Sequence, residues 1–234
     1  MRGALALAIA LLGTLPASAH DIERAEALLT DVAAHRRAAN DGASEAERAE
    51  AVFYLGERVE ALVEALNADV AAHGTRDLFA ERVAARLQAH AIGVTWTPAA
   101  GRYVYDQAAL REYLHRAPRG RFAPEAKFRL MAQRFYATLG ADPDVLVGTD
   151  MAALQRAAVE EERFLVEYPA HPRAETVRFF LAVDHYRIAR NVRDPARRAE
   201  HTRRARQALQ QTVEHSSQTF DVRAAQTLLE RLAR

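Results

Sequence analysis

Glu112 and His115 have a spacing that occurs in di-iron helical bundles, where a Glu-x-x-His pair lies on one helix face and points inward. A di-iron site requires two such pairs and two further glutamates. No other histidine of this chain has a glutamate three residues before it. We therefore interpret the two residues as a surface pair near a helix C-terminus, where His115 and the neighbouring Arg116 complement the helix dipole.

Three aspartates, Asp142, Asp144 and Asp150, form a second candidate site, because carboxylate oxygens are ligands that Ca²⁺ prefers. Their spacing does not fit an EF-hand loop, which ends in a glutamate that is missing here. Asp-Pro-Asp is instead common in turns, and Asp150 is suited to cap a following helix. The sequence favours a turn and a helix cap over a calcium site.

His20 is a third candidate, because a histidine at a mature N-terminus can chelate Cu(II) through its amino group and imidazole. Such a site needs a second histidine, which the sequence does not place. The chain contains no Gly-x-Ser-x-Gly, His-Glu-x-x-His or phosphate-binding glycine loop. We predict no catalytic, cofactor-binding or metal-binding residues.

A basic segment holds eight arginines within twenty residues, diluted by Asp194 and Glu200. They are Arg187, Arg190, Arg193, Arg197, Arg198, Arg203, Arg204 and Arg206. Such a segment is suited to an anionic envelope component, such as lipid head groups, peptidoglycan carboxylates or an acidic protein segment. The alternative is a solvated face whose charge is relieved by residues 160–162 on the adjacent helix. We take Arg197, Arg203 and Arg204 as candidate partner-binding residues.

Residues 92–105 are rich in β-branched and aromatic side chains. Two such runs are joined by Pro-Ala-Ala-Gly, which predicts a β-hairpin. An isolated hairpin is marginal in water, so its Val94/Trp96 side is expected to lie on neighbouring helices. We expect Trp96 in the core, and Tyr103 and Tyr105 on a contact surface as candidate partner-binding residues.

The N-terminus has the pattern of a signal peptide. Met1-Arg2 precedes an apolar run from Ala4 to Leu12, and Ala17-Ser18-Ala19 matches the small-x-small sequence of a cleavage site. The run is too short to cross a bilayer as a helix, and no later stretch approaches the length needed. We predict that residues 1–19 are removed and that the mature protein is periplasmic, without an integral membrane segment.

The composition excludes several other classes. The chain has no cysteine, which rules out disulfides, thiolate metal sites and a cysteine nucleophile. Its 32 basic and 31 acidic side chains nearly balance, so we expect no nucleic-acid partner. The basic residues are almost all arginine, which we interpret as typical of a GC-rich bacterial genome.

Apolar periodicity predicts helices over most of the remaining chain. The N-terminal helical region with the hairpin spans 20–106, and Ser44 with Glu47 forms a capping box for its long second helix. Gly56 is a place where that helix is expected to kink or break. Further on, a proline corner separates two helices. The second of these has one apolar face, which we expect to be buried and which carries Val177, Phe180, Leu181 and Tyr186.

The segment 107–234 contains internal repeats. A shift of 51 residues superposes Phe128 on Phe179 and Phe135 on Tyr186, and a further shift of 48 residues gives a weaker third copy. Repeats of this length stack, because one helix pair does not bury its apolar face alone.

One motif in this segment reads Tyr168-Pro169-x-x-Pro172-x-Ala174-x-x-Val177-x-Phe179-Phe180-Leu181-Ala182, preceded by Ala157 and Leu165. It resembles the tetratricopeptide repeats of bacterial envelope proteins, such as the Tol–Pal coordinator and the lipoprotein of the outer-membrane β-barrel assembly machine. Glu161 stands where that family commonly has an aromatic residue, and Val177 where it usually has alanine. The resemblance covers about residues 107–234 and implies a superhelix that binds proteins.

The sequence thus predicts an all-α fold, a tetratricopeptide-like stack of antiparallel helix pairs with a small β-hairpin near 92–105. It favours a non-catalytic periplasmic scaffold of the cell envelope that binds a protein or peptide in a helical-repeat groove. The alternative is an envelope enzyme or metal-binding accessory protein with its site between the N-terminal helices and the hairpin. Exposed aromatics and arginines in a groove favour the first function, and a buried carboxylate pair in a cleft favours the second.

Overall fold

A computed structural model describes residues 22–74, 78–140 and 142–233. The predicted leader, its cleavage site after Ala19 and the candidate His20 lie outside these residues. Helices make up most of the described chain and its strands form one antiparallel hairpin, so the predicted all-α fold with a small hairpin is confirmed. The chain divides into two compact units after Ala126, whereas the sequence places the start of the repeats at residue 107. No helix within the described ranges is both long and apolar enough to cross a membrane.

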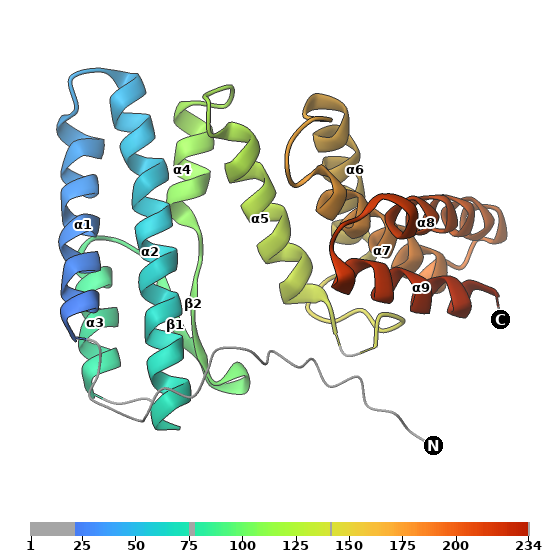
Figure 1. Cartoon of the computed structure of the whole chain (residues 1–234), viewed down its shortest axis with the longest axis horizontal. Helices are drawn as coiled ribbons and strands as arrows, with labels where there is room; N and C mark the ends of the chain where they lie inside the picture. Colours follow the sequence, from blue (N-terminus) through green and yellow to red (C-terminus); the bar gives the residue numbers. More distant parts are fainter. Residues whose placement is uncertain (1–21, 75–77, 141, 234) are drawn as a thin grey trace. The chain divides into compact units, whose positions relative to one another are not determined.

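In the first unit the other elements attach to one long helix. The bounds are α1 Ile22–Asp41, α2 Glu45–His73, α3 Leu78–Ala89, β1 Val94–Thr97, β2 Arg102–Tyr105 and α4 Ala108–Arg116. α1, α4 and β2 all pack on α2, and α3 contacts α1 and β1 (Figure 1). A short 3-10 helix, Pro98–Ala100, joins the strands.

α2 extends over 29 residues because both of its ends are capped. Ser44 accepts a hydrogen bond from the Glu47 amide, and the Glu47 carboxylate accepts one from the Ser44 amide, which confirms the predicted capping box. Gly74 ends the helix in the left-handed conformation, with φ of 71°. Gly56 does not break α2. A Cβ atom there would lie 3.0 Å from a methyl carbon of Leu110, so the glycine allows α4 to pack closely.

The hairpin packs one face on α2. Val94 pairs with Tyr105 and Trp96 with Tyr103, so these four side chains share one face of the two strands. Asn67 of α2 binds the edge of β2. Its side-chain amide donates to the Tyr103 carbonyl at 2.9 Å, and its side-chain oxygen accepts from the Tyr103 amide at 2.7 Å. Apolar burial and these two hydrogen bonds therefore hold the hairpin on the helix.

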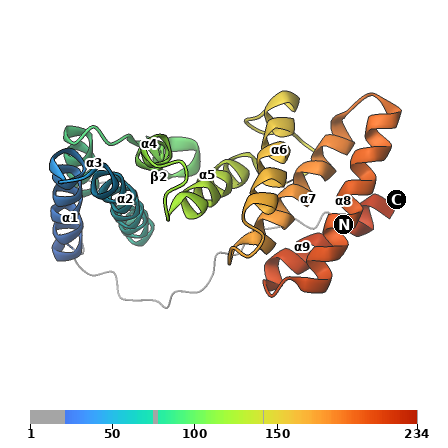
Figure 2. The same ribbon diagram turned by 90° about the horizontal axis from the view of Figure 1, so that it is seen from above.

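The second unit is a succession of helices joined mostly by short loops. α5, Ala123–Thr138, spans the division between the units, and α6 Met151–Glu167, α7 Ala174–Asn191, α8 Pro195–His215 and α9 Thr219–Ala233 follow. α7 lies between α6 and α8, and α9 contacts both α8 and α7 (Figure 2). Short loops make helices that follow one another run antiparallel, which is the arrangement that the sequence predicts for the repeats.

Side chains of α5, α7, α8 and α9 meet in one core. Phe180 is fully buried and stacks on Phe135 of α5, with ring centroids 4.2 Å apart. Val177 and Tyr186 are fully buried as well, and Leu181 is partly buried. The predicted apolar face of α7 is therefore confirmed.

Candidate functional site

The two hairpin tyrosines belong to the core. Tyr103 is 3% exposed and Tyr105 is 5% exposed. The expectation that they form a contact surface is wrong, because the register of the hairpin puts both on the same buried face as Val94. Trp96, which was expected in the core, is only half-buried, and its ring packs edge-on against Tyr103 with centroids 5.1 Å apart.

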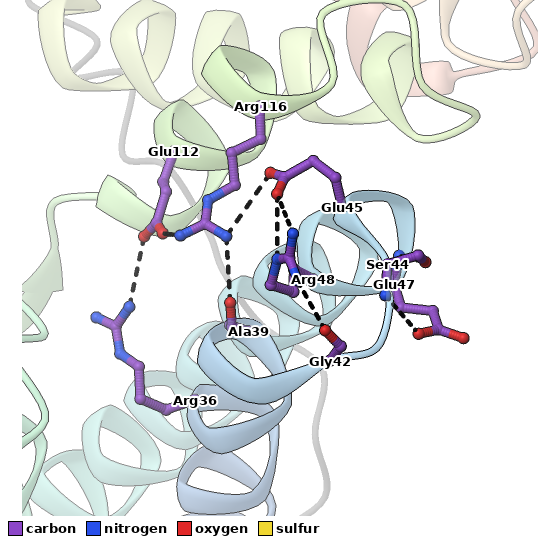
Figure 3. A network of polar contacts seen from close by, with 9 residues as sticks. All are labelled: Arg36, Ala39, Gly42, Ser44, Glu45, Glu47, Arg48, Glu112 and Arg116. Atoms are coloured by element: carbon purple, nitrogen blue, oxygen red, sulfur yellow. Dashed lines mark hydrogen bonds and ion pairs between the residues drawn. The ribbon is translucent and has the colours of Figure 1, made fainter.

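Glu112 belongs to an ion-pair network that joins α4 to α1. Its carboxylate lies 3.4 Å from Arg36 of α1 and 2.8 Å from Arg116, one turn further along α4. Arg116 also donates to the Ala39 carbonyl at 3.1 Å, so the end of α1 is held against α4 (Figure 3). His115 is exposed. The Glu-x-x-His pair is thus divided between a structural network and the surface.

The three aspartates between α5 and α6 have structural contacts. Arg231 of α9 lies 3.1 Å from Asp142, and Arg190 of α7 lies 3.3 Å from Asp144. The backbone amide of Asp144, and then the Arg231 guanidinium, lower the pKa of Asp142. Asp150 caps α6, as the sequence predicts, since its side chain accepts a hydrogen bond from the third amide of the helix. These contacts tie the loop to α7 and α9.

Two of the three candidate arginines of α8 have carboxylate partners close by. Arg204 lies 3.1 Å from Glu162 of α6, and Arg203 lies 2.5 Å from Glu200 on its own helix. The ion pair between Arg204 and Glu162 is expected if this helix face is solvated and residues 160–162 offset its positive charge. Arg197 is exposed. Residues of α8 also line a shallow depression, namely Pro195, Arg198, Ala199, Thr202, Arg203, Arg206, Gln207 and Gln210.

Arg187, predicted as part of the basic segment, is fully buried in a charged cluster. It lies 3.4 Å from Asp184 and donates to the Thr138 carbonyl at 2.7 Å. Glu161, also fully buried, lies 3.2 Å from Arg134 of α5. Burial, and then the negative charge of Asp184, raise the pKa of Glu161, and burial raises the pKa of Asp184 to about 6. Each carboxylate has its own arginine, so the cluster ties α5, α6 and α7 together.

Two histidines face each other between α7 and α8. The Nδ1 atoms of His185 and His201 lie 3.2 Å apart, and Glu162 of α6 lies 3.4 Å from Nε2 of His185. His185 is buried and His201 is partly exposed. Burial, and then the positive charges of His201 and Arg204, lower the pKa of His185 to about 4. His185 is therefore neutral near neutral pH.

Aromatic side chains form a surface over the core that α5 and α7 share. Tyr136 of α5 is 54% exposed, and its ring packs edge-on against buried Phe180 with centroids 5.7 Å apart. Phe128 stacks on the same ring at 6.3 Å, and the guanidinium of Arg173 lies over Phe128 at 5.6 Å. Together with Asp221 of α9, the side chains of Tyr136, Phe128 and Arg173 form what we call the aromatic–acidic surface.

Asp221 lies in the first turn of α9 and is only 5% exposed. Its Oδ2 atom is enclosed and has no hydrogen-bond partner among the described residues. Burial raises the pKa of this carboxyl to about 6. Burial, and then the negative charge of Asp221, raise the pKa of Tyr136. Phe220, the residue before Asp221, is 52% exposed.

Comparisons with known proteins add no assignment: no protein-family model matches this chain, and no curated protein sequence matches it. Within the described ranges, no group of three or more His, Cys, Asp or Glu side chains is arranged to bind a metal ion.

Sequence reasoning missed Tyr136 and Asp221. Tyr136 had one usable signal, since it follows the core residue Phe135 and falls outside the apolar periodicity of its helix. Asp221 had none, because an acidic residue in the first turn of a helix is common and normally exposed. Only the packing of α9 shows that this carboxylate is enclosed.

Proposed function

We propose that this protein is a non-catalytic scaffold of the bacterial cell envelope, exported to the periplasm, which binds a protein or peptide on its helical repeats. The aromatic–acidic surface carries the proposal, because Tyr136 is more than half exposed above a buried aromatic core. Tyrosines held in this way are enriched among the residues that dominate binding energy in protein interfaces. The resemblance of residues 107–234 to tetratricopeptide repeats supports the same function, since such arrays bind partners on extended surfaces.

The alternative function, an envelope enzyme or metal-binding accessory protein, has weaker support. A buried carboxylate pair is the feature expected of it, and Glu161 and Asp184 are such a pair. However, the two carboxylates contact Arg134 and Arg187, which is the arrangement of a structural ion-pair cluster. The inner face of the hairpin, next to which that site was expected, is occupied by core side chains such as Tyr103.

Capture of partners from envelope extract tests the binding function. The wild-type protein, Tyr136→Ala and the control Val166→Ala are immobilised and their bound proteins are compared by mass spectrometry. Val166 is a matched control because it is 81% exposed and lies on α6, outside the aromatic–acidic surface. We expect a partner that binds the wild type and Val166→Ala but is lost with Tyr136→Ala. A set of bound proteins that is the same for all three contradicts the proposal.

Export is tested separately. N-terminal sequencing of the protein from a periplasmic fraction should begin at His20, because the pattern Ala17-Ser18-Ala19 is the predicted cleavage signal. A mature chain that begins at Met1 contradicts export by this signal.

A further inference from the structure

We propose that Asp221 binds the guanidinium or ammonium group of a basic side chain on the partner, with Tyr136 packing against the same cation. The inference rests on the proposed function and names the chemistry of the partner that the aromatic–acidic surface takes.

Asp221 differs from the other buried carboxylates of the described chain. Glu161 contacts Arg134, and Asp184 contacts Arg187, so both have a counter-ion. Asp221 is buried too, at 5% exposed, but no ion pair of the described residues includes it, and its Oδ2 atom has no hydrogen-bond partner there. A buried carboxylate without a partner costs folding free energy, and a cation from outside would offset that cost on binding.

Arg173, the basic side chain of this surface, does not fill this role. Arg173 is close enough to Tyr136 for its charge to lower the pKa of the phenol, but its guanidinium lies over the Phe128 ring at 5.6 Å. Among the described residues no ion pair joins Arg173 to Asp221. The described residues therefore leave the carboxylate without a counter-ion, which a partner would have to supply.

The geometry suits an organic cation better than a metal ion. Ca²⁺ and Mg²⁺ require about six or more oxygen ligands, and a single carboxylate is a poor chelator. A guanidinium can donate two parallel hydrogen bonds to one carboxylate, and an ammonium group can donate up to about three. A tyrosine ring face attracts such cations within about 6 Å, and Tyr136 presents an exposed ring, with a phenol whose pKa the charge of Asp221 raises. The two groups together recognise both the charge and the apolar stem of an arginine or lysine.

Short synthetic peptides test this chemistry directly. The peptide Ac-Gly-Ala-X-Ala-Gly-NH₂, with X as arginine, lysine, citrulline or glutamate, is titrated into the mature exported protein, and binding is followed by NMR. Citrulline has the shape of arginine without its charge. Asp221→Asn removes the charge of the site, and Glu230→Gln is the matched control because Glu230 is an exposed carboxylate on the same helix.

The arginine or lysine peptide should bind about tenfold or more tightly than the citrulline peptide, and shift resonances of Tyr136 and the first turn of α9, because charged pairs in desolvated sites are strong. Asp221→Asn should abolish this preference, and Glu230→Gln should keep it. The inference is overturned if citrulline binds as well as arginine, if Asp221→Asn keeps the preference, or if the shifts map elsewhere.

This test separates the inference from the proposed function. If an envelope partner is lost with Tyr136→Ala but keeps its affinity for Asp221→Asn, the inference fails and the function stands. If basic peptides depend on Asp221 while capture from the extract is unaffected by Tyr136→Ala, the function fails and the cation site stands.

Discussion

Phe135 of α5 and Phe180 of α7 stack with ring centroids 4.2 Å apart, and each is at most 2% exposed. The pair forms the base on which Tyr136 packs. The aromatic–acidic surface is therefore built directly on the core of the second unit.

Truncation of this base should be costly. We expect Phe180→Ala to lower the free energy of unfolding by about 3–5 kcal/mol, because it leaves a cavity where a large aromatic side chain was packed. Urea denaturation measures the change. Val166→Ala is the control and should change stability by less than about 0.5 kcal/mol, since Val166 is exposed. A loss below about 1 kcal/mol for Phe180→Ala contradicts the observed packing.

The histidine pair predicts a loss of stability in acid. The folded-state pKa of His185 is about 4, below its usual value, so the unfolded chain takes up a proton near pH 6 while the folded chain does not. Stability from this group is present above the usual pKa and is lost as pH falls toward 4. Each unit of pKa difference corresponds to about 1.4 kcal/mol, so the loss between pH 7 and pH 5 should be about 2 kcal/mol.

His185→Gln isolates the contribution of His185 to the acid loss of stability, because glutamine does not titrate. Urea melts at pH 7 and pH 5 should show a smaller acid loss for the variant than for the wild type. The other groups near His185, namely His201, Arg204, Glu200 and Glu162, are present in both proteins and their contributions largely cancel. Equal acid losses in the two proteins would show that His185 can be protonated in the folded state.

Asp221 predicts the opposite dependence on pH. Its folded-state pKa is raised to about 6, so its ionised form destabilises the fold at pH 7, and this cost disappears as pH falls through 6 toward 4. Asp221→Asn should raise the free energy of unfolding at pH 7 by about 1–3 kcal/mol. At pH 4.5 most of this difference should be gone, and the Glu230→Gln control should show no such dependence. A destabilised asparagine variant at pH 7 would mean that Asp221 supports the start of α9.

The arginines of α8 should affect binding rather than folding. Replacement of Arg197, Arg203 and Arg204 by glutamine should change thermal stability little, because exposed ion pairs contribute up to about 1 kcal/mol each. If the partner found by capture is anionic at this helix, its affinity for the wild type should weaken steeply between about 0.01 and 0.15 M salt, since the Debye length falls from about 30 to 8 Å. The triple variant should lose this salt dependence. If the triple variant binds the partner with the affinity of the wild type, these arginines belong to a solvated surface and not to the binding site.

The amino-acid sequence by itself determined the local elements of this protein. The capping box at Ser44 and Glu47, the Asp150 cap, the hairpin and the apolar face of α7 are all as predicted. Such features depend on residues within a turn or two of each other, or on apolar side chains that recur every two residues in a strand or every 3.6 residues in a helix. Both kinds of pattern can be read along the chain.

Tertiary structure alone decided which side chains are enclosed and which polar groups find a partner. Tyr103 and Tyr105 are buried because the hairpin register puts them on the face of Val94, and Arg187 is buried because α5 and α7 surround it with acceptors. The enclosure of Asp221 depends on how α9 packs in its unit. Partners for a buried polar group come from segments distant in the chain, so no local pattern in the sequence reports them.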